Sequence, residues 1–148
     1  MKIKLLFLSM FLIFIIFTIT FAFSQTTMTE WNNKGKDLFN KGDYEGAIEC
    51  FNKIIEMDPT SYQAWFNKGK CYYKLGNYGK AVGCYDEALK YKSDFVAALN
   101  SKGEALNKLG KYSEALVCFN KVLSNTTDHL HAKEEIAEAE AVIDNQTN

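Results

Sequence analysis

The chain has 148 residues, a length that fits one domain. It carries 17 basic and 18 acidic residues, for a formal net charge of −1. Proteins that bind nucleic acid usually carry a basic surface, so we expect no nucleic-acid partner. Apolar residues make up 47% of the chain, a share that is raised by the apolar N-terminus.

Residues 1–24 are predicted to be an export leader. Two lysines precede a run without charge that ends at Phe23. Small residues one and three positions before Gln25 are typical of signal-peptide cleavage after Ser24. The run also just reaches the length of a membrane span, so an uncleaved transmembrane signal-anchor stays open as the alternative. Either alternative places the rest of the chain on the extracytoplasmic side, secreted or anchored to the membrane.

After a short polar spacer at 25–29, apolar side chains recur at the three- and four-residue spacing of helices. This spacing predicts three pairs of short helices followed by one final helix. The expected helices are 28–40 and 44–57, 62–75 and 78–91, 95–109 and 112–124, and last 131–143. The final helix carries acidic residues that we interpret as a solvated face: Glu134, Glu135, Glu138 and Glu140.

The helix pairs are copies of one unit that repeats every 34 residues. The positions that return in register include Gly35, Gly69 and Gly103, then Ala47, Ala81 and Ala115, then Phe51, Tyr85 and Phe119. Glycines at 42, 76 and 110 recur between the two helices of each unit, as expected for helix ends. A fixed period in this range indicates a repeat protein in which successive units share one core. In the central unit, Gly69 and Ala81 are small enough for the two helices to approach closely.

The central unit reads W-x2-K-G-x2-Y, then G-x-Y-x2-A-x3-Y-x2-A, and this pattern resembles the tetratricopeptide repeat (TPR). The resemblance covers roughly residues 28–129 and implies an all-α, right-handed superhelical stack. The implied repeats are residues 28–61, 62–95 and 96–129, and residues 130–148 would form a capping helix and tail. The chain departs from the family pattern at Leu99, where a tryptophan is usual, and has only one of the late prolines, Pro59.

The resemblance also implies a partner-binding groove, because the first helices of such repeats line a concave face that binds a peptide or a helix. The matching positions are Asn32, Lys36, Phe39, Asn40, Phe66, Lys70, Tyr73, Lys74, Asn100, Glu104, Asn107 and Lys108. The lysines among them favour an acidic or carboxylate-bearing ligand. The alternative interpretation is that Phe66 and Tyr73 belong partly to the core and that the lysines are only solvated.

One subclass of the family binds the acidic C-termini of heat-shock chaperones through a clamp of lysine, asparagine and arginine. The matching positions here are Asn32, Lys36, Asn67, Ala97 and Ser101, and only Asn67 agrees. We therefore do not expect this function.

Three of the four cysteines, Cys50, Cys84 and Cys118, occupy equivalent places in successive repeats. Helix axes pack 8–10 Å apart, whereas a disulfide needs Cα atoms within about 7 Å, so these three should not pair with one another. A bridge from Cys71 to Cys50 or Cys84 stays open. We expect small buried apolar side chains rather than a metal site, because no C-x2-C spacing is present.

Two other polar features are expected to lie in loops. His129 and His131 could bind a metal ion as a pair, but a solvated turn is the simpler interpretation. Asn125 and Asn145 begin N-glycosylation sequons, which we expect outside the helices.

No nucleophile and base pair, phosphate-binding loop or pair of catalytic carboxylates can be assembled, so we expect no enzyme, no cofactor and no metal. The predicted function is a protein-interaction scaffold outside the cytoplasmic membrane. We expect the protein to contact a membrane only through the leader, if the leader is not cleaved. The alternative is a structural module of an envelope assembly that associates with itself.

Overall fold

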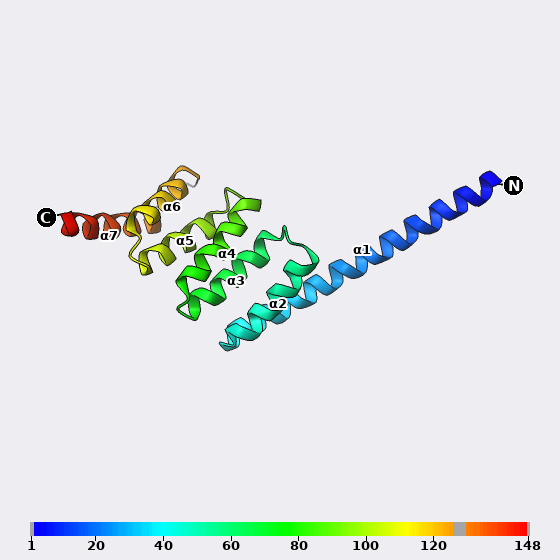
Figure 1. The fold of residues 1–148 in the computed structure, drawn as a ribbon, viewed down its shortest axis with the longest axis horizontal. Helices are drawn as coiled ribbons and strands as arrows, with labels where there is room; N and C mark the ends of the chain where they lie inside the picture. The colour runs from blue at the N-terminus through cyan, green and yellow to red at the C-terminus, as the bar shows by residue number, and fades with distance from the viewer. Residues whose placement is uncertain (1, 126–129, 148) are drawn as a thin grey trace.

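The structure is a computed structural model that describes residues 2–125 and 130–147. Every element in that part of the chain is an α-helix, and consecutive helices pack side by side into one elongated stack (Figure 1). The helices are α1 (Lys2–Lys41), α2 (Tyr44–Met57), α3 (Tyr62–Lys74), α4 (Tyr78–Tyr91), α5 (Val96–Lys108), α6 (Tyr112–Asn125) and α7 (Leu130–Thr147). The predicted all-α solenoid is therefore confirmed, and the expected helix boundaries are close to those observed from α2 to α6.

Helix α1 differs from the expectation, because it is one helix of 40 residues. The polar spacer predicted at 25–29 is wrong: these residues continue the helix. Neither glycine nor proline occurs before Gly35, so no residue interrupts the backbone hydrogen bonds where we expected a break. The N-terminal half of α1 extends away from the other helices (Figure 1). Within the described ranges, we found no helix with the length and apolar content that crossing a membrane requires.

The two helices of each repeat are joined by a tight turn that only glycine favours. Gly42, Gly76 and Gly110 have φ angles of +84°, +73° and +74°, in the left-handed region. At the first turn the Gly42 amide donates to the Phe39 carbonyl at 3.0 Å, and the Asp43 amide donates to the Leu38 carbonyl at 2.9 Å. This pair of bonds satisfies carbonyl groups at the helix end and reverses the chain. The next helix therefore returns antiparallel to the first.

The core is built where a glycine of each first helix faces an aromatic ring of the second. A Cβ atom added to Gly69 would lie 2.6 Å from Cε1 of Tyr85, and one added to Gly35 would lie 2.9 Å from Cε1 of Phe51. Tyr85 and Phe51 are each 1% exposed. The helices of a repeat can approach this closely only because the first one carries no side chain at that point.

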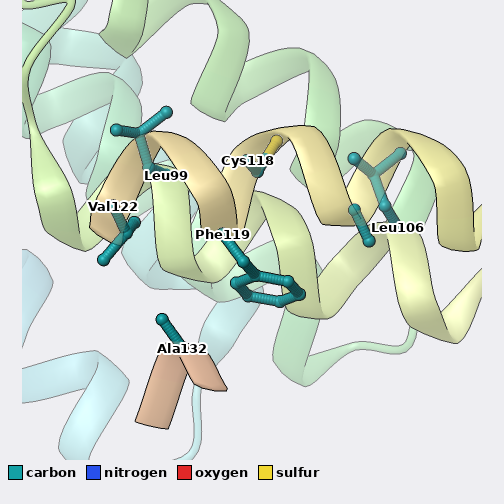
Figure 2. Packing of buried hydrophobic residues seen from close by; sticks show 7 residues of the cluster. Leu99, Leu106, Cys118, Phe119, Val122 and Ala132 are labelled. Carbon is teal, nitrogen blue, oxygen red and sulfur yellow. The ribbon is translucent and has the colours of Figure 1, made fainter. Parts of the chain in front are cut away.

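Helix α7 covers the end of the stack, as predicted for a capping helix. Ala132 is buried with Phe119 and Val122 of α6 and Leu99 of α5 (Figure 2). Ile136 packs against the same cluster. Helix α7 is longer than the predicted 131–143 and includes Asn145, whose side chain is exposed.

Candidate peptide-binding surface

The first pocket lies where α1 and α3 pass each other. It has a volume of about 220 Å³ and is lined by Lys36, Phe39, Asn40, Phe51, Asn67 and Lys70. Lys36 and Asn40 are one turn apart on α1, and Asn67 and Lys70 are one turn apart on α3, so each helix presents an amide and a lysine. The lining combines two positive charges, two amides and two phenyl rings.

Lys70 is held in this pocket by aromatic rings. Its Nζ atom lies 4.9 Å from the centre of the Phe39 ring and 5.8 Å from the centre of the Phe66 ring. Each ring face attracts the ammonium group, with a contribution of about 0.5–1 kcal/mol at a partly exposed site. An ammonium group held in this way keeps N–H donors for a ligand, and with Lys36 it favours a carboxylate.

The second pocket lies between the third repeat and the cap, and it has a volume of about 550 Å³. It is lined by Tyr73 of α3, Glu104, Asn107 and Lys108 of α5, Tyr112 of α6, and Glu135, Glu138 and Val142 of α7. The amide nitrogen Nδ2 of Asn107 donates to Oε2 of Glu135 at 2.9 Å, which joins α5 to the cap. Burial, and then the negative charge of Glu104, raise the pKa of Tyr73.

The predicted groove residues fall into these pockets in two groups. Lys36, Phe39, Asn40 and Lys70 line the first pocket, whereas Tyr73, Glu104, Asn107 and Lys108 line the second. The structure therefore brings each group of four together in one pocket.

Four predicted groove residues lie elsewhere or have a second role. Asn32 lines a separate hollow of about 230 Å³ with Met28 and Ser61. Phe66 is half-buried and packs against Phe95, with ring centres 5.0 Å apart, so it belongs partly to the core. Lys74 is exposed, and the side-chain oxygen of Asn100 is buried.

Sequence reasoning did not assign several pocket residues to the groove. The sequence identifies Phe51 only as a position that recurs with the repeat, and Asn67 only as a position of the chaperone clamp. Tyr112 is expected only as a recurring position at the start of the helix 112–124. Glu135 was interpreted as part of a solvated face, which is wrong, because its side chain is half-buried and accepts the bond from Asn107. The 34-residue period could not predict that Glu135 lines a pocket, because the cap lies outside the repeats.

The four cysteines are free and buried. The bridges that stayed open for Cys71 are therefore not present, and the prediction of small buried side chains is confirmed. Burial raises the pKa of Cys71 to about 12 and that of Cys84 to about 11, which keeps both thiols protonated and unreactive near neutral pH. Among the described residues, no group of three histidine, cysteine or acidic side chains could hold a metal ion.

Two predictions near the C-terminus have mixed outcomes. His129 lies outside the described residues, so its solvated turn stays a prediction. The turn predicted for His131 is wrong, because this residue is the second of α7. The expectation that both sequons lie outside helices is wrong: Asn125 ends α6, and Asn145 lies within α7. The backbone there continues in helix because glycine and proline are absent from residues 130–147.

The stacked helix pairs, their glycine turns and the pockets between them define an all-helical solenoid of tetratricopeptide repeats. A family model described as "Anaphase-promoting complex, cyclosome, subunit 3" matches residues 40–122. This match covers more than half of the chain, and the chain belongs to that family, which is of the tetratricopeptide type. No curated protein matches the chain.

Solved structures with the same fold include peptide complexes. The first TPR of Spaghetti (RPAP3) bound to the HSP90 peptide SRMEEVD has a TM-score of 0.77 and 23% identity, over 80% of this chain and 94% of that one. The second TPR domain of human RPAP3 in complex with the HSP70 peptide SGPTIEEVD has a TM-score of 0.75 and 26% identity, over 79% and 98%. The TPR2B domain of yeast Sti1 in a complex with pHsp70 has a TM-score of 0.73 and 20% identity, over 78% and 98%. Such folds are typically protein-interaction modules rather than enzymes, and a protein-interaction role is supported here.

Proposed function

We propose that this protein is a scaffold that binds an acidic peptide segment of a partner protein in the pocket between α1 and α3. The observation that carries this proposal is the position of Lys70, whose ammonium group lies over the Phe39 ring beside Lys36 and Asn67. A carboxylate that enters the pocket would meet two positive charges and two amide groups. The phenyl rings offer apolar contact to the rest of the ligand side chain.

The similar structures support a peptide ligand but do not fix its identity. Two of them carry peptides that end in two glutamates, a valine and an aspartate. Of the five positions that match the chaperone clamp, only Asn67 agrees with it, and the two on α5, Ala97 and Ser101, carry no charge. The positive charge of the first pocket comes instead from α1 and α3. We therefore propose that side chains of α1 and α3 bind the acidic ligand, without the full set of residues that forms the chaperone clamp.

A direct test measures the fluorescence anisotropy of labelled acidic heptapeptides, including SRMEEVD, as the full chain is added. Each acidic peptide is compared with a form in which its glutamates and aspartates are replaced by the neutral amides. The chain is expected to bind acidic peptides and not the neutral forms. Replacing Lys36 and Lys70 together by glutamine should weaken binding about tenfold or more.

The matched control is Lys121→Gln, which removes the same charge from an exposed position of α6. It should leave affinity unchanged, and circular dichroism should show the same helicity for all variants. Equal binding of acidic and neutral peptides, no saturable binding to any of them, or equal losses in the control would contradict the proposal.

We also propose that the first 24 residues direct export, so that the repeats act outside the cytoplasmic membrane. Support comes from the uncharged run behind two lysines and from Met10 to Ile16, seven consecutive large apolar side chains that are each at least 37% exposed. The stack does not cover these side chains, and an exposed apolar run of this size usually has a partner of its own.

Mass spectrometry of the protein from its own cells tests the export proposal. An exported chain that begins at Gln25 indicates a cleaved leader, and an exported chain that keeps Met1 indicates an anchor. A full-length chain found in the cytosolic fraction would contradict export. Sedimentation of the full chain over a range of concentrations tests the structural alternative, which needs mass to rise with concentration.

A further inference from the structure

The pocket between α5 and the cap has the opposite electrostatic character from the first pocket. Its lining contains three carboxylates, Glu104, Glu135 and Glu138, and only one lysine, Lys108. At neutral pH the lining is therefore net negative. The raised pKa of Tyr73, to which the charges of Glu104 and Glu135 both contribute, is consistent with a negative potential in this space.

Asn107, one of the residues that line this pocket, carries a buried acceptor without a donor. Nδ2 of Asn107 donates to Oε2 of Glu135 at 2.9 Å, and a carboxylate only accepts, so this bond fixes which end of the amide faces the cap. The other end, Oδ1 of Asn107, is buried and has no hydrogen-bond partner among the described residues. The unpaired acceptor shows that the described residues do not satisfy every polar group around Asn107, and a ligand group that brings N–H donors would also balance the excess negative charge of the lining.

The size and lining of the pocket favour an organic cation over a metal ion. Its carboxylates do not form a group of three that could hold a metal, within the described part of the chain. A space of about 550 Å³ instead has room for a long side chain. Tyr73 and Tyr112 add ring faces, which attract ammonium and especially planar guanidinium groups.

We propose that this pocket binds a basic side chain, arginine or lysine, of the same partner peptide whose acidic part binds between α1 and α3. This inference rests on the proposed function for the identity of the ligand as a peptide. Lys70 of the first pocket and Tyr73 of the second are one turn apart on α3, so the two pockets adjoin the same helix. One extended ligand can therefore reach both pockets, and their opposite charges would fix its direction along the stack.

The experiment is an NMR titration of the isotopically labelled full chain with Nα-acetyl-argininamide, Nα-acetyl-lysinamide and Nα-acetyl-citrullinamide. Citrulline has nearly the shape of arginine but no charge. We expect saturable shifts of the Asn107 and Tyr112 signals with the arginine probe, with the lysine probe, or with both, and no shifts with citrulline. The comparison of the two cations shows which basic side chain the pocket prefers.

The charge of the pocket is tested by Glu135→Gln combined with Glu138→Gln, which keep the side-chain size. Affinity for the cationic probes should fall about tenfold or more. The matched control is Glu140→Gln on the exposed face of α7, which should leave affinity unchanged. Saturable binding of citrulline equal to that of arginine, shifts confined to other regions, no saturable shift with either cation, or equal losses in the control would overturn the proposal.

The two proposals fail in different ways. Loss of the cation pocket by the two glutamate substitutions should leave the binding of purely acidic peptides unchanged, because Lys36 and Lys70 are intact. Failure of the acidic peptides with retained arginine binding would remove the proposed function and leave the basic-side-chain pocket in place.

Discussion

Two exposed glycines in α4 offer a test of how the repeats are stabilised. Gly79 and Gly83 are exposed, and a Cβ atom added at either position would meet nothing within 4 Å beyond its chain neighbours and the backbone of its own helix. Glycine loses more backbone entropy than alanine when it enters a helix, so replacing it by alanine should stabilise the fold. No contact offsets this gain.

The expected size differs between the two positions. Gly83 is the sixth residue of α4, in the helix interior, where the change from glycine to alanine contributes about 1 kcal/mol. Gly79 is the second residue, where the backbone is less constrained, so we expect roughly half of that gain. A domain of about 100 residues gains roughly 4 °C of melting temperature per kcal/mol. Gly83→Ala should therefore raise the melting temperature by about 4 °C and Gly79→Ala by about 2 °C.

Thermal unfolding followed by far-UV circular dichroism measures these shifts, and Gly69→Ala is the matched control. It is the same substitution within a helix, but its Cβ would lie 2.6 Å from Cε1 of Tyr85, so the core must shift and the fold should lose about 1–3 kcal/mol. The reasoning is that backbone freedom decides the effect at Gly83 and close packing decides it at Gly69. A lower melting temperature for Gly83→Ala, or no loss of stability for Gly69→Ala, would refute it.

Further predictions concern the core. Phe119→Ala should lower the free energy of unfolding by about 3–5 kcal/mol in denaturant titrations, because Phe119 is fully buried beneath the cap; a loss under 1 kcal/mol would contradict this packing. At pH 8 the folded chain should react with a thiol reagent far more slowly than the chain in guanidinium, because the pKa values of Cys71 and Cys84 are about 12 and about 11. Because these pKa values are raised in the folded chain, the unfolded chain loses its thiol protons first as pH rises above about 9, so the free energy of unfolding should fall from there toward pH 11–12. The fall should be less steep in Cys71→Ala, and an equally steep fall in that variant would contradict the raised pKa of Cys71.

The sequence predicted the fold well because the same small residues and turn glycines recur at the same positions of every repeat. The period of 34 residues aligned Gly69 with its equivalents, and the small residue in each first helix is the point of closest approach in the structure. The turn glycines were also predictable, since their φ angles of +73° to +84° exclude most other residues. These features depend on local geometry that is the same in every copy.

The spacer and the cap show where local reasoning failed. We expected a break before Met28 because the composition changes there from apolar to polar, but composition alone does not end a helix. With no glycine or proline before Gly35, the helix of α1 continues from Lys2 to Lys41. The acidic residues of the cap were interpreted from their spacing on one helix, which says nothing about the helix that they face.

The sequence by itself determined the number of repeats, the helices of each pair and the residues that meet within a pair, because those contacts recur at fixed spacing. Only the tertiary structure decided how the groove is divided. Helix α7 docks so that Glu135 bonds to Asn107, 28 residues earlier, and the gap between α1 and α3 brings Lys36 near Lys70. These contacts join different repeats, or a repeat and the cap, and their geometry follows from how whole helices pack rather than from the spacing of side chains along one helix.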